Sequence, residues 1–219
     1  MLRTDILDEK IIGLADRLKI IARYEVGFDN IDTEAAAAKE IYVSHTPAAN
    51  INSVAEHVTG LILAISRQTV KVDTAIRQGN FGVRDAAYGM KLKGKMLEQA
   101  DFISLHLPYD KALHHFINQE KLGLMKPTAF LINAARGGLV DEVALTEALN
   151  NKSIVGAALD VFEQEPVPAG YSLLKLDNLI VTPHLATLTK EAMSTMSLDC
   201  AKEIVRVKNQ QEPLVWLNM

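Results

Sequence analysis

Short apolar runs alternate with amphipathic stretches along most of the chain, and this alternation predicts an α/β fold with a largely parallel sheet. The run Ile154-Val-Gly-Ala-Ala-Leu159 has no polar position. Such a run is expected of a strand that helices cover on both faces. The predicted strands are 18–22, 41–43, 102–107, 129–134, 154–161 and 179–182.

Apolar residues with helical spacing lie between these strands. The segment Ser53-Val-Ala-Glu56 has the pattern of a capping box. Val58, Leu61 and Ile65 then share one face of a predicted helix, which can continue to Gly79. The other predicted elements are an extended arm over 80–95 and helices over 119–125, 141–150 with Asp141 as the cap, and 190–209.

Composition narrows the function classes. The 219 residues are 48% hydrophobic and 23% charged, which is a globular composition with enough chain for one large domain or two small ones. A formal charge of −4 leaves no basic surplus for nucleic acid. The single cysteine, Cys200, permits no internal disulfide and no thiolate zinc cluster. Without an apolar run of membrane-span length or a signal-peptide core, we expect a cytoplasmic protein with no membrane segment.

Polar side chains follow three neighbouring predicted strands, where parallel sheets hold their active sites. These side chains are Arg136, Glu165 and His184. An arginine binds and polarises substrate oxygens, a histidine carries a proton, and a carboxylate orients the imidazole. Each residue alone is equally compatible with a surface or structural role, but the three together favour a site for a carbonyl substrate. The other histidines lack the H-x-x-x-H spacing of metal ligands, so we predict no metal site.

Three motifs, in this order and spacing, resemble the NAD-dependent D-isomer-specific 2-hydroxyacid dehydrogenases. They are LINAARGGLVDE at 131–142, GAALDVFEQEP at 156–166 and Thr182-Pro-His184. Earlier segments also match the family, at 26–32, 46–50, 53–56 and 100–108. The resemblance therefore extends from about Leu18 to the last residue, with one break.

The resemblance implies roles for particular residues. His184 would be the proton donor and acceptor, Glu165 its carboxylate partner, and Arg136 the residue that holds the carboxylate and carbonyl of the substrate. The substrate would be a small 2-hydroxy or 2-oxo acid, and the cofactor would be NAD, with NADP not excluded. The positions at which the family contacts its cofactor correspond to Thr46, Ala134, Arg136 and Asp160.

The resemblance also implies an architecture of two domains. A flavodoxin-like substrate-binding domain would contain residues 1–66 and 187–219, truncated at its start. A Rossmann-like nucleotide-binding domain would contain residues 67–186. Within it, the helix and arm over 67–95 would help to form a homodimer.

The glycines mark the main departure from the family pattern. No two of the twelve are separated by a single residue, so the chain contains no G-x-G-x-x-G sequence. Lys95 is followed at once by Met-Leu-Glu-Gln-Ala-Asp101, which resembles a point beyond the first βαβ unit of the family. We therefore predict a nucleotide-binding domain without its first βαβ unit. A second departure is Glu25, where the family commonly has a glycine close to the substrate carboxylate.

Three hypotheses account for these departures. In the first hypothesis, the complete protein has a segment that is missing from this sequence, and it is an ordinary dehydrogenase. Alternatively, the chain is a shortened, catalytically inactive relative that acts as a dimerisation module. A third hypothesis is a protein that binds a small acid without redox turnover. The spacing of consecutive Cα atoms near 95–97 and a titration with NADH would distinguish these hypotheses.

Overall fold

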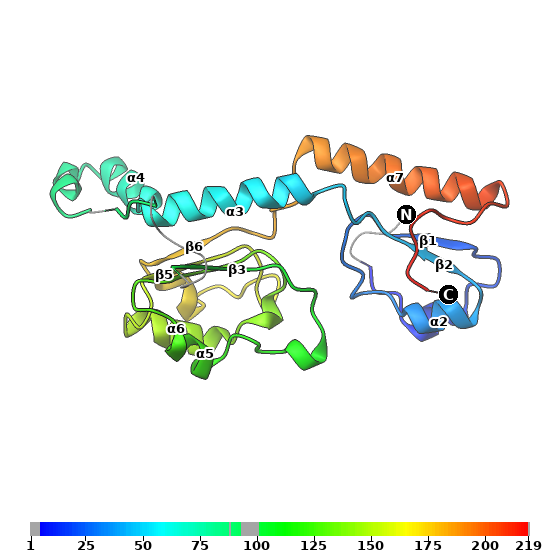
Figure 1. Cartoon of the computed structure of the whole chain (residues 1–219), viewed down its shortest axis with the longest axis horizontal. Helices are drawn as coiled ribbons and strands as arrows, with labels where there is room; N and C mark the ends of the chain where they lie inside the picture. The colour runs from blue at the N-terminus through cyan, green and yellow to red at the C-terminus, as the bar shows by residue number, and fades with distance from the viewer. Residues whose placement is uncertain (1–4, 88, 93–100, 219) are drawn as a thin grey trace. The chain divides into compact units, whose positions relative to one another are not determined.

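The computed structural model describes residues 5–87, 89–92 and 101–218, and the chain forms two compact units (Figure 1). The first unit contains residues 1–53 and 187–219, and the second contains residues 54–186. Every strand pair in the described residues is parallel, which confirms the predicted α/β class. The junction at 95–97, whose Cα spacing bears on the three hypotheses, lies outside the described residues.

The first unit is built around two parallel strands, β1 (Ile20–Ala22) and β2 (Tyr42–Ser44). Because successive strand residues point to opposite faces, Ile21 and Ala22 enter different hydrophobic clusters. The cluster around Ile21 includes residues of helices α1 (Glu9–Gly13) and α2 (Thr33–Ala38). The cluster around Ala22 includes residues of helix α7 (Lys190–Lys208).

The C-terminal residues complete this first unit by hydrogen bonding along β2. The Leu217 amide donates to the Val43 carbonyl at 2.9 Å. The Asn218 side chain accepts from the Val43 amide at 2.8 Å and donates to the Ile41 carbonyl at 3.0 Å. These bonds join the last described residues of the chain to strand β2. Both chain ends therefore contribute to the first unit.

The second unit contains a four-stranded parallel sheet with the order β3-β4-β5-β6. The strands are β3 (Phe102–Leu105), β4 (Phe130–Asn133), β5 (Gly156–Leu159) and β6 (Leu179–Val181). Each strand therefore lies beside the one that precedes it in the chain. All four carboxyl ends lie at one edge of the sheet, which is where we expected the functional side chains.

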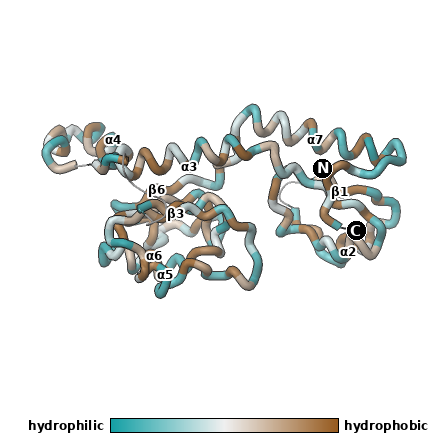
Figure 2. Tube along the Cα trace, viewed as in Figure 1, coloured by the Kyte–Doolittle hydropathy of each residue, from teal (hydrophilic) through white to brown (hydrophobic). Residues whose placement is uncertain are grey.

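Helices cover both faces of this sheet (Figure 1). Helices α5 (Gln119–Leu124) and α6 (Glu142–Asn150) pack on one face, in a core that includes Leu131 and Leu159. Helix α3 (Ile51–Ser66) packs on the other face. Figure 2 shows hydrophobic residues concentrated along the strands between these layers. The described residues also form 3-10 turns at Phe81–Asp85, Lys111–Leu113, Gly137–Leu139 and Ser172–Lys175.

The structure corrects the predicted course of the chain around α3. This helix begins at Ile51, so Ser53 lies inside its first turn, and the Ser53 hydroxyl pairs with the Thr189 hydroxyl at 2.8 Å instead of capping the helix. The predicted continuous helix is interrupted by Gln68, whose φ of 53° is left-handed, and α4 (Thr69–Arg77) begins after it. Part of the predicted extended arm is a 3-10 turn, Phe81–Asp85.

The boundary between the two units also differs from the predicted one at 66/67. It lies between Ser53 and Val54, so most of α3 belongs to the second unit. The physical reason is burial, because Val58, Leu61 and Ile65 pack against the sheet of that unit. The other boundary, between 186 and 187, is at the predicted position. No helix in the described parts of the chain has the length and apolar character to cross a bilayer.

Candidate active site

Asp160 follows β5 and organises the carboxyl edge of the sheet. Its side chain is fully buried, and its carboxylate accepts hydrogen bonds from the Thr182 hydroxyl at 2.6 Å and from the amides of Leu185 and Ala186 at 3.0 and 2.9 Å. Its backbone carbonyl accepts from the His184 amide at 2.7 Å. Four hydrogen bonds to Asp160 therefore hold the segment 182–186 after β6, and this segment contains His184.

His184 and Glu165 form a hydrogen-bonded pair at this edge. Imidazole Nδ1 lies 2.8 Å from Oε2 of the carboxylate. The other carboxylate oxygen accepts from the Phe162 amide at 3.0 Å, which fixes the carboxyl group as it faces the ring. His184 has a left-handed φ of 52°, a conformation that the Asp160 bonds support. With Nδ1 engaged, Nε2 remains as the atom for proton exchange with a substrate.

Arg136 lies in a tight loop after β4. Asn133, the last residue of that strand, is buried, donates to the Arg136 carbonyl at 2.9 Å and accepts from the Ala135 amide at 3.1 Å. The Arg136 guanidinium donates to the Ala135 carbonyl at 2.8 Å. A Cβ on Gly137 would lie 1.9 Å from backbone atoms of Phe162, so only glycine allows this loop to touch the loop that follows β5.

Thr46 lies in the first unit, just after β2. Its side chain is buried, and its hydroxyl has no hydrogen-bond partner among the described residues. Its amide donates to the Glu25 carbonyl at 3.2 Å. The Glu25 carboxylate, which departs from the family pattern, lies 3.3 Å from the guanidinium of Arg23. This ion pair compensates the extra negative charge that the sequence places in the loop.

An apolar hollow of about 420 Å³ lies beside the His184 and Glu165 pair. Its walls include Phe162, Val167 and Leu174. The pair is therefore partly surrounded by hydrocarbon, and both of its side chains are still more than a third exposed, at 42% and 37%. A proton can be exchanged at such a site with a small molecule that arrives from solvent.

Metal-ligating side chains do not gather at this edge. Within residues 5–87, 89–92 and 101–218, no three His, Cys, Asp or Glu side chains are placed to hold a metal ion together. The described polar side chains at this edge can transfer a proton, bind an anion and form hydrogen bonds.

The structure brings most of the predicted site residues to one edge of one sheet. Glu165 and His184 are in direct contact, and Asp160 supports the backbone of His184. Ala134 and Arg136 follow the neighbouring strand β4 and are half-buried. Thr46 belongs to the first unit.

Three contributors to this edge were not identified from the sequence as functional. Asn133 shapes the Arg136 loop, and Glu142 binds the loop that carries Glu165. His57, one of the histidines without metal-ligand spacing, places Nε2 at 3.1 Å from the Thr182 hydroxyl and 3.5 Å from the Asp160 carboxylate. A polar residue that ends or directly follows an all-apolar strand was the available signal for Asn133. No comparable signal marks the other two.

Comparisons with known proteins identify the family of this chain. The sequence profile described as "D-isomer specific 2-hydroxyacid dehydrogenase, NAD binding domain" matches residues 90–186. Glyoxylate reductase from Thermofilum pendens is 36% identical over 270 residues, with 99% of this chain and 80% of that protein covered. The aligned region is longer than the 219 residues of this chain, so the relative has residues with no counterpart here.

Two solved structures match nearly the whole of this chain. The NADPH-dependent glyoxylate/hydroxypyruvate reductase of Sinorhizobium meliloti, in complex with NADP and malonate, matches with a TM-score of 0.86 and 27% identity, covering 97% of this chain and 82% of that one. The D-lactate dehydrogenase of Aquifex aeolicus, complexed with NAD and lactic acid, matches with a TM-score of 0.83 and 28% identity, covering 98% and 84%.

Proposed function

This chain belongs to the D-isomer specific 2-hydroxyacid dehydrogenases, a family of NAD(P)-dependent oxidoreductases, and from that premise we propose that it interconverts a small 2-oxo acid and its 2-hydroxy acid. The contact of 2.8 Å between His184 and Glu165 carries this proposal, because it is the arrangement that proton transfer at a carbonyl requires. Relatives named glyoxylate reductase favour glyoxylate as the first substrate to test.

We assign the proton to His184. In the reducing direction, Nε2 of the protonated ring gives its proton to the oxygen of the substrate carbonyl. Glu165 holds Nδ1 and stabilises the positive charge of the ring until that transfer. In the oxidising direction, Nε2 takes the proton back from the 2-hydroxyl group.

We assign the substrate carboxylate to Arg136. A guanidinium can bind a carboxylate through two parallel hydrogen bonds, which fixes the orientation of the acid as well as its position. The loop between β4 and α6 holds this residue through Asn133, so the guanidinium starts from a fixed base. The hydride at the reacting carbon is the chemistry that the nicotinamide supplies when it is bound.

The residues present fit one end of that cofactor better than the other. In the second unit, Ala134 and Arg136 are half-buried at the carboxyl edge of the sheet, and in the first unit Thr46 has a buried hydroxyl without a hydrogen-bond partner among the described residues; we propose all three as cofactor contacts. Asp160 is the fourth position expected to contact the cofactor. Its carboxylate already accepts three hydrogen bonds, so we propose that it acts by holding the segment that carries His184. The sequence contains no G-x-G-x-x-G turn to hold a pyrophosphate.

The test is the reduction of glyoxylate with NADH or NADPH by the purified chain. We expect His184→Ala to lower kcat by roughly 100-fold or more, because general acid–base catalysis contributes about that much. Nucleotide binding, followed by fluorescence, should change little. Arg136→Ala should instead raise the KM for glyoxylate. A wild-type protein without turnover at millimolar nucleotide would support the inactive, shortened relative, and equal kcat values for wild type and His184→Ala would remove the histidine from the mechanism.

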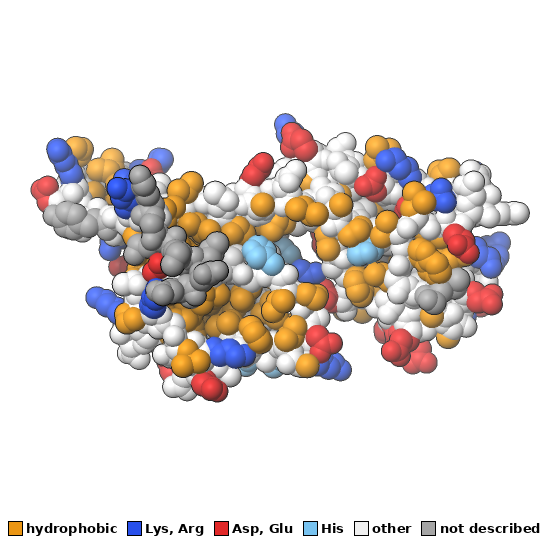
Figure 3. All heavy atoms as spheres, in the orientation of Figure 1, with side chains coloured by type: hydrophobic (Ala, Val, Ile, Leu, Met, Phe, Trp, Pro, Cys, Tyr) orange, Lys and Arg blue, Asp and Glu red, His pale blue; other side chains and the backbone are white. Residues whose placement is uncertain are grey.

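We further propose that two copies of the chain associate through α4 and the turn after it. None of the residues of α4 is buried, and Val70, Ile76 and Phe81 expose 53%, 44% and 69% of their surface. Figure 3 shows hydrophobic side chains over this segment. Burial of such side chains against a second copy is favourable. Sedimentation should show a dimer for the wild type and a monomer for the double variant Ile76→Asp, Phe81→Asp; a monomeric wild type would contradict the proposal.

A further inference from the structure

Two loops of the second unit meet at the candidate site. One loop, after β4, carries Arg136, and the other, after β5, carries Glu165. The two backbones touch at Gly137 and Phe162. The relative position of arginine and carboxylate therefore depends on whatever holds these loops together.

Glu142, in the first turn of α6, makes such a connection. Only 3% of its surface is exposed, and one carboxylate oxygen accepts from the Glu163 amide at 2.8 Å. The other oxygen accepts from the Tyr171 hydroxyl at 2.7 Å. The helix that follows the Arg136 loop is thus bonded directly to the backbone two residues before Glu165.

The Tyr171 hydroxyl is a dependable donor in this arrangement. Burial of the phenol and its hydrogen bond to Glu142 raise the pKa of Tyr171 far above its usual value. The phenol therefore keeps its proton at every pH at which the protein would work. The carboxylate of Glu142 has a donor on each oxygen, which fixes the orientation of the group.

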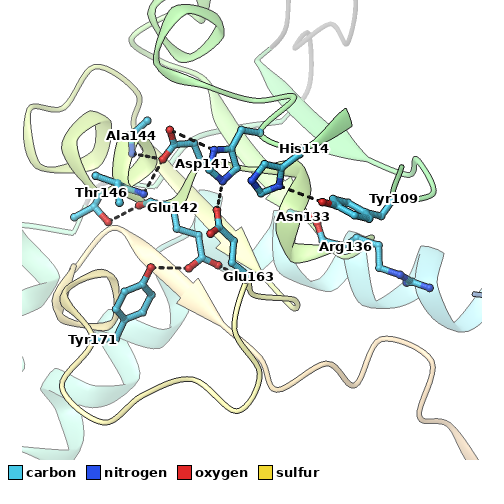
Figure 4. A network of polar contacts seen from close by, with 12 residues as sticks. Tyr109, His114, Asn133, Arg136, Asp141, Glu142, Ala144, Thr146, Glu163 and Tyr171 are labelled. Carbon is cyan, nitrogen blue, oxygen red and sulfur yellow. Dashed lines mark hydrogen bonds and ion pairs between the residues drawn. The ribbon is translucent and has the colours of Figure 1, made fainter. Parts of the chain in front are cut away.

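A second connection runs beside the first. His115 Nε2 lies 2.6 Å from the Glu163 carboxylate, and Nδ1 lies 3.8 Å from that of Asp141, the cap of α6. Figure 4 shows this network around Glu142 and Glu163, with the Arg136 side chain extending away from it. Glu163 is therefore held by its backbone and by its side chain.

We propose that Glu142 is a positioning residue for the reaction, which acts by holding the Glu163 peptide so that Glu165 stays in contact with Nδ1 of His184. The role depends on the reach of the side chain and on its acceptor oxygen, and not on its charge. This inference rests on the function proposed above, because it assigns the support of the same proton-transferring pair.

Two conservative variants separate reach from charge. Glu142→Asp keeps the charge but shortens the side chain by one methylene, which withdraws it from the Glu163 amide. Glu142→Gln keeps the reach and an acceptor oxygen while it removes the charge, and its amide group can donate to the Tyr171 oxygen. Glu142→Ala removes the charge, the reach and both acceptor oxygens. Glu147→Ala, an exposed glutamate on the same helix, is the matched control.

The first readout is the tautomer of the neutral His184 ring, measured by ¹⁵N NMR on histidine-labelled protein, with His184→Gln to assign the signal. A firm Glu165 contact keeps the proton on Nδ1. We expect Glu142→Asp and Glu142→Ala to lower the Nδ1–H population, and Glu142→Gln and Glu147→Ala to keep the wild-type population. If Glu142→Ala does not fold, the Asp and Gln pair still decides the question.

The second readout is the kinetics of the proposed reaction. Glu142→Asp should lower kcat roughly 10- to 100-fold with a KM within about twofold of the wild type, because displacement of a catalytic group affects the reaction more than binding. Glu142→Gln should stay within about threefold. A wild-type tautomer and kcat in Glu142→Asp, or a loss in Glu142→Gln as large as in Glu142→Ala, would overturn the role. An inactive wild type whose tautomers follow the expected series would instead contradict the proposed function alone.

Discussion

Asp160 shows how a single buried carboxylate can shape a site without facing the substrate. Its oxygens receive a hydroxyl and two amides, and its backbone carbonyl receives a third amide. The residues that supply these donors surround His184 in the sequence. The backbone geometry of His184 is therefore set by a fully buried neighbour.

We expect Asp160→Ala to be strongly destabilising. Removal of the carboxylate takes the shared acceptor away from the part-buried Thr182 hydroxyl and Leu185 amide and from the buried Ala186 amide, and a buried group left unpaired costs about 1–3 kcal/mol. Urea denaturation should show a decrease of at least about 3 kcal/mol in the free energy of unfolding. Thr182→Val, which removes only one donor, is the comparison and should cost much less. Equal stabilities for the two variants would argue against the role of Asp160 as a shared acceptor.

At the scale of elements, the loops after β4 and β5 behave as one structure because Gly137 brings their backbones into contact. We expect Gly137→Ala to force them apart, because the new Cβ would lie 1.9 Å from backbone atoms of Phe162. Thermal unfolding should begin at a clearly lower temperature, and kcat should fall with it. Gly60→Ala in α3 is the control: it meets nothing within 4 Å, and alanine should stabilise a helix there by up to about 1 kcal/mol. Similar melting temperatures for Gly137→Ala and wild type would contradict the contact.

The elements also show what the sequence could and could not predict. Strands of the second unit were found within about two residues, because continuous apolar runs and the helices between them are local signals. Arg136, Glu165 and His184 could be selected as candidates because each follows such a strand, and the structure places Glu165 and His184 in contact. The break at Gln68 was missed because the apolar spacing continues across it, and the start of α3 was misplaced because the Ser53 hydroxyl has a tertiary partner, Thr189.

Glu142 could not be recognised from the sequence for a related reason. An acidic residue in the first turn of a helix is ordinary, because it interacts favourably with the helix dipole. What distinguishes Glu142 is burial against Tyr171 and the Glu163 amide, which lie 29 and 21 residues further along the chain. Such contacts exist only once the loops have been folded over α6.

At the scale of the whole molecule, two chain ends build one unit and the middle of the chain builds the other. The three hypotheses raised by the sequence concern the middle unit. Membership of the dehydrogenase family is established by the comparisons, and His184 and Glu165 are in hydrogen-bond contact. The aligned relative nevertheless carries residues that this chain lacks.

The order of the strands in the second sheet leads to a prediction about which half of the cofactor contributes to binding. A dinucleotide-binding sheet has two mononucleotide-binding halves, and the strand order reverses between them. Among the described residues the order runs from β3 to β6 in one direction without reversal, as it does within one half. We therefore expect reduced nicotinamide mononucleotide to bind with a Kd within about threefold of that of NADH, a difference of less than about 1 kcal/mol. Isothermal titration with both nucleotides would measure this ratio. A preference of tenfold or more for NADH would contradict the prediction and show that the chain also binds the adenosine end.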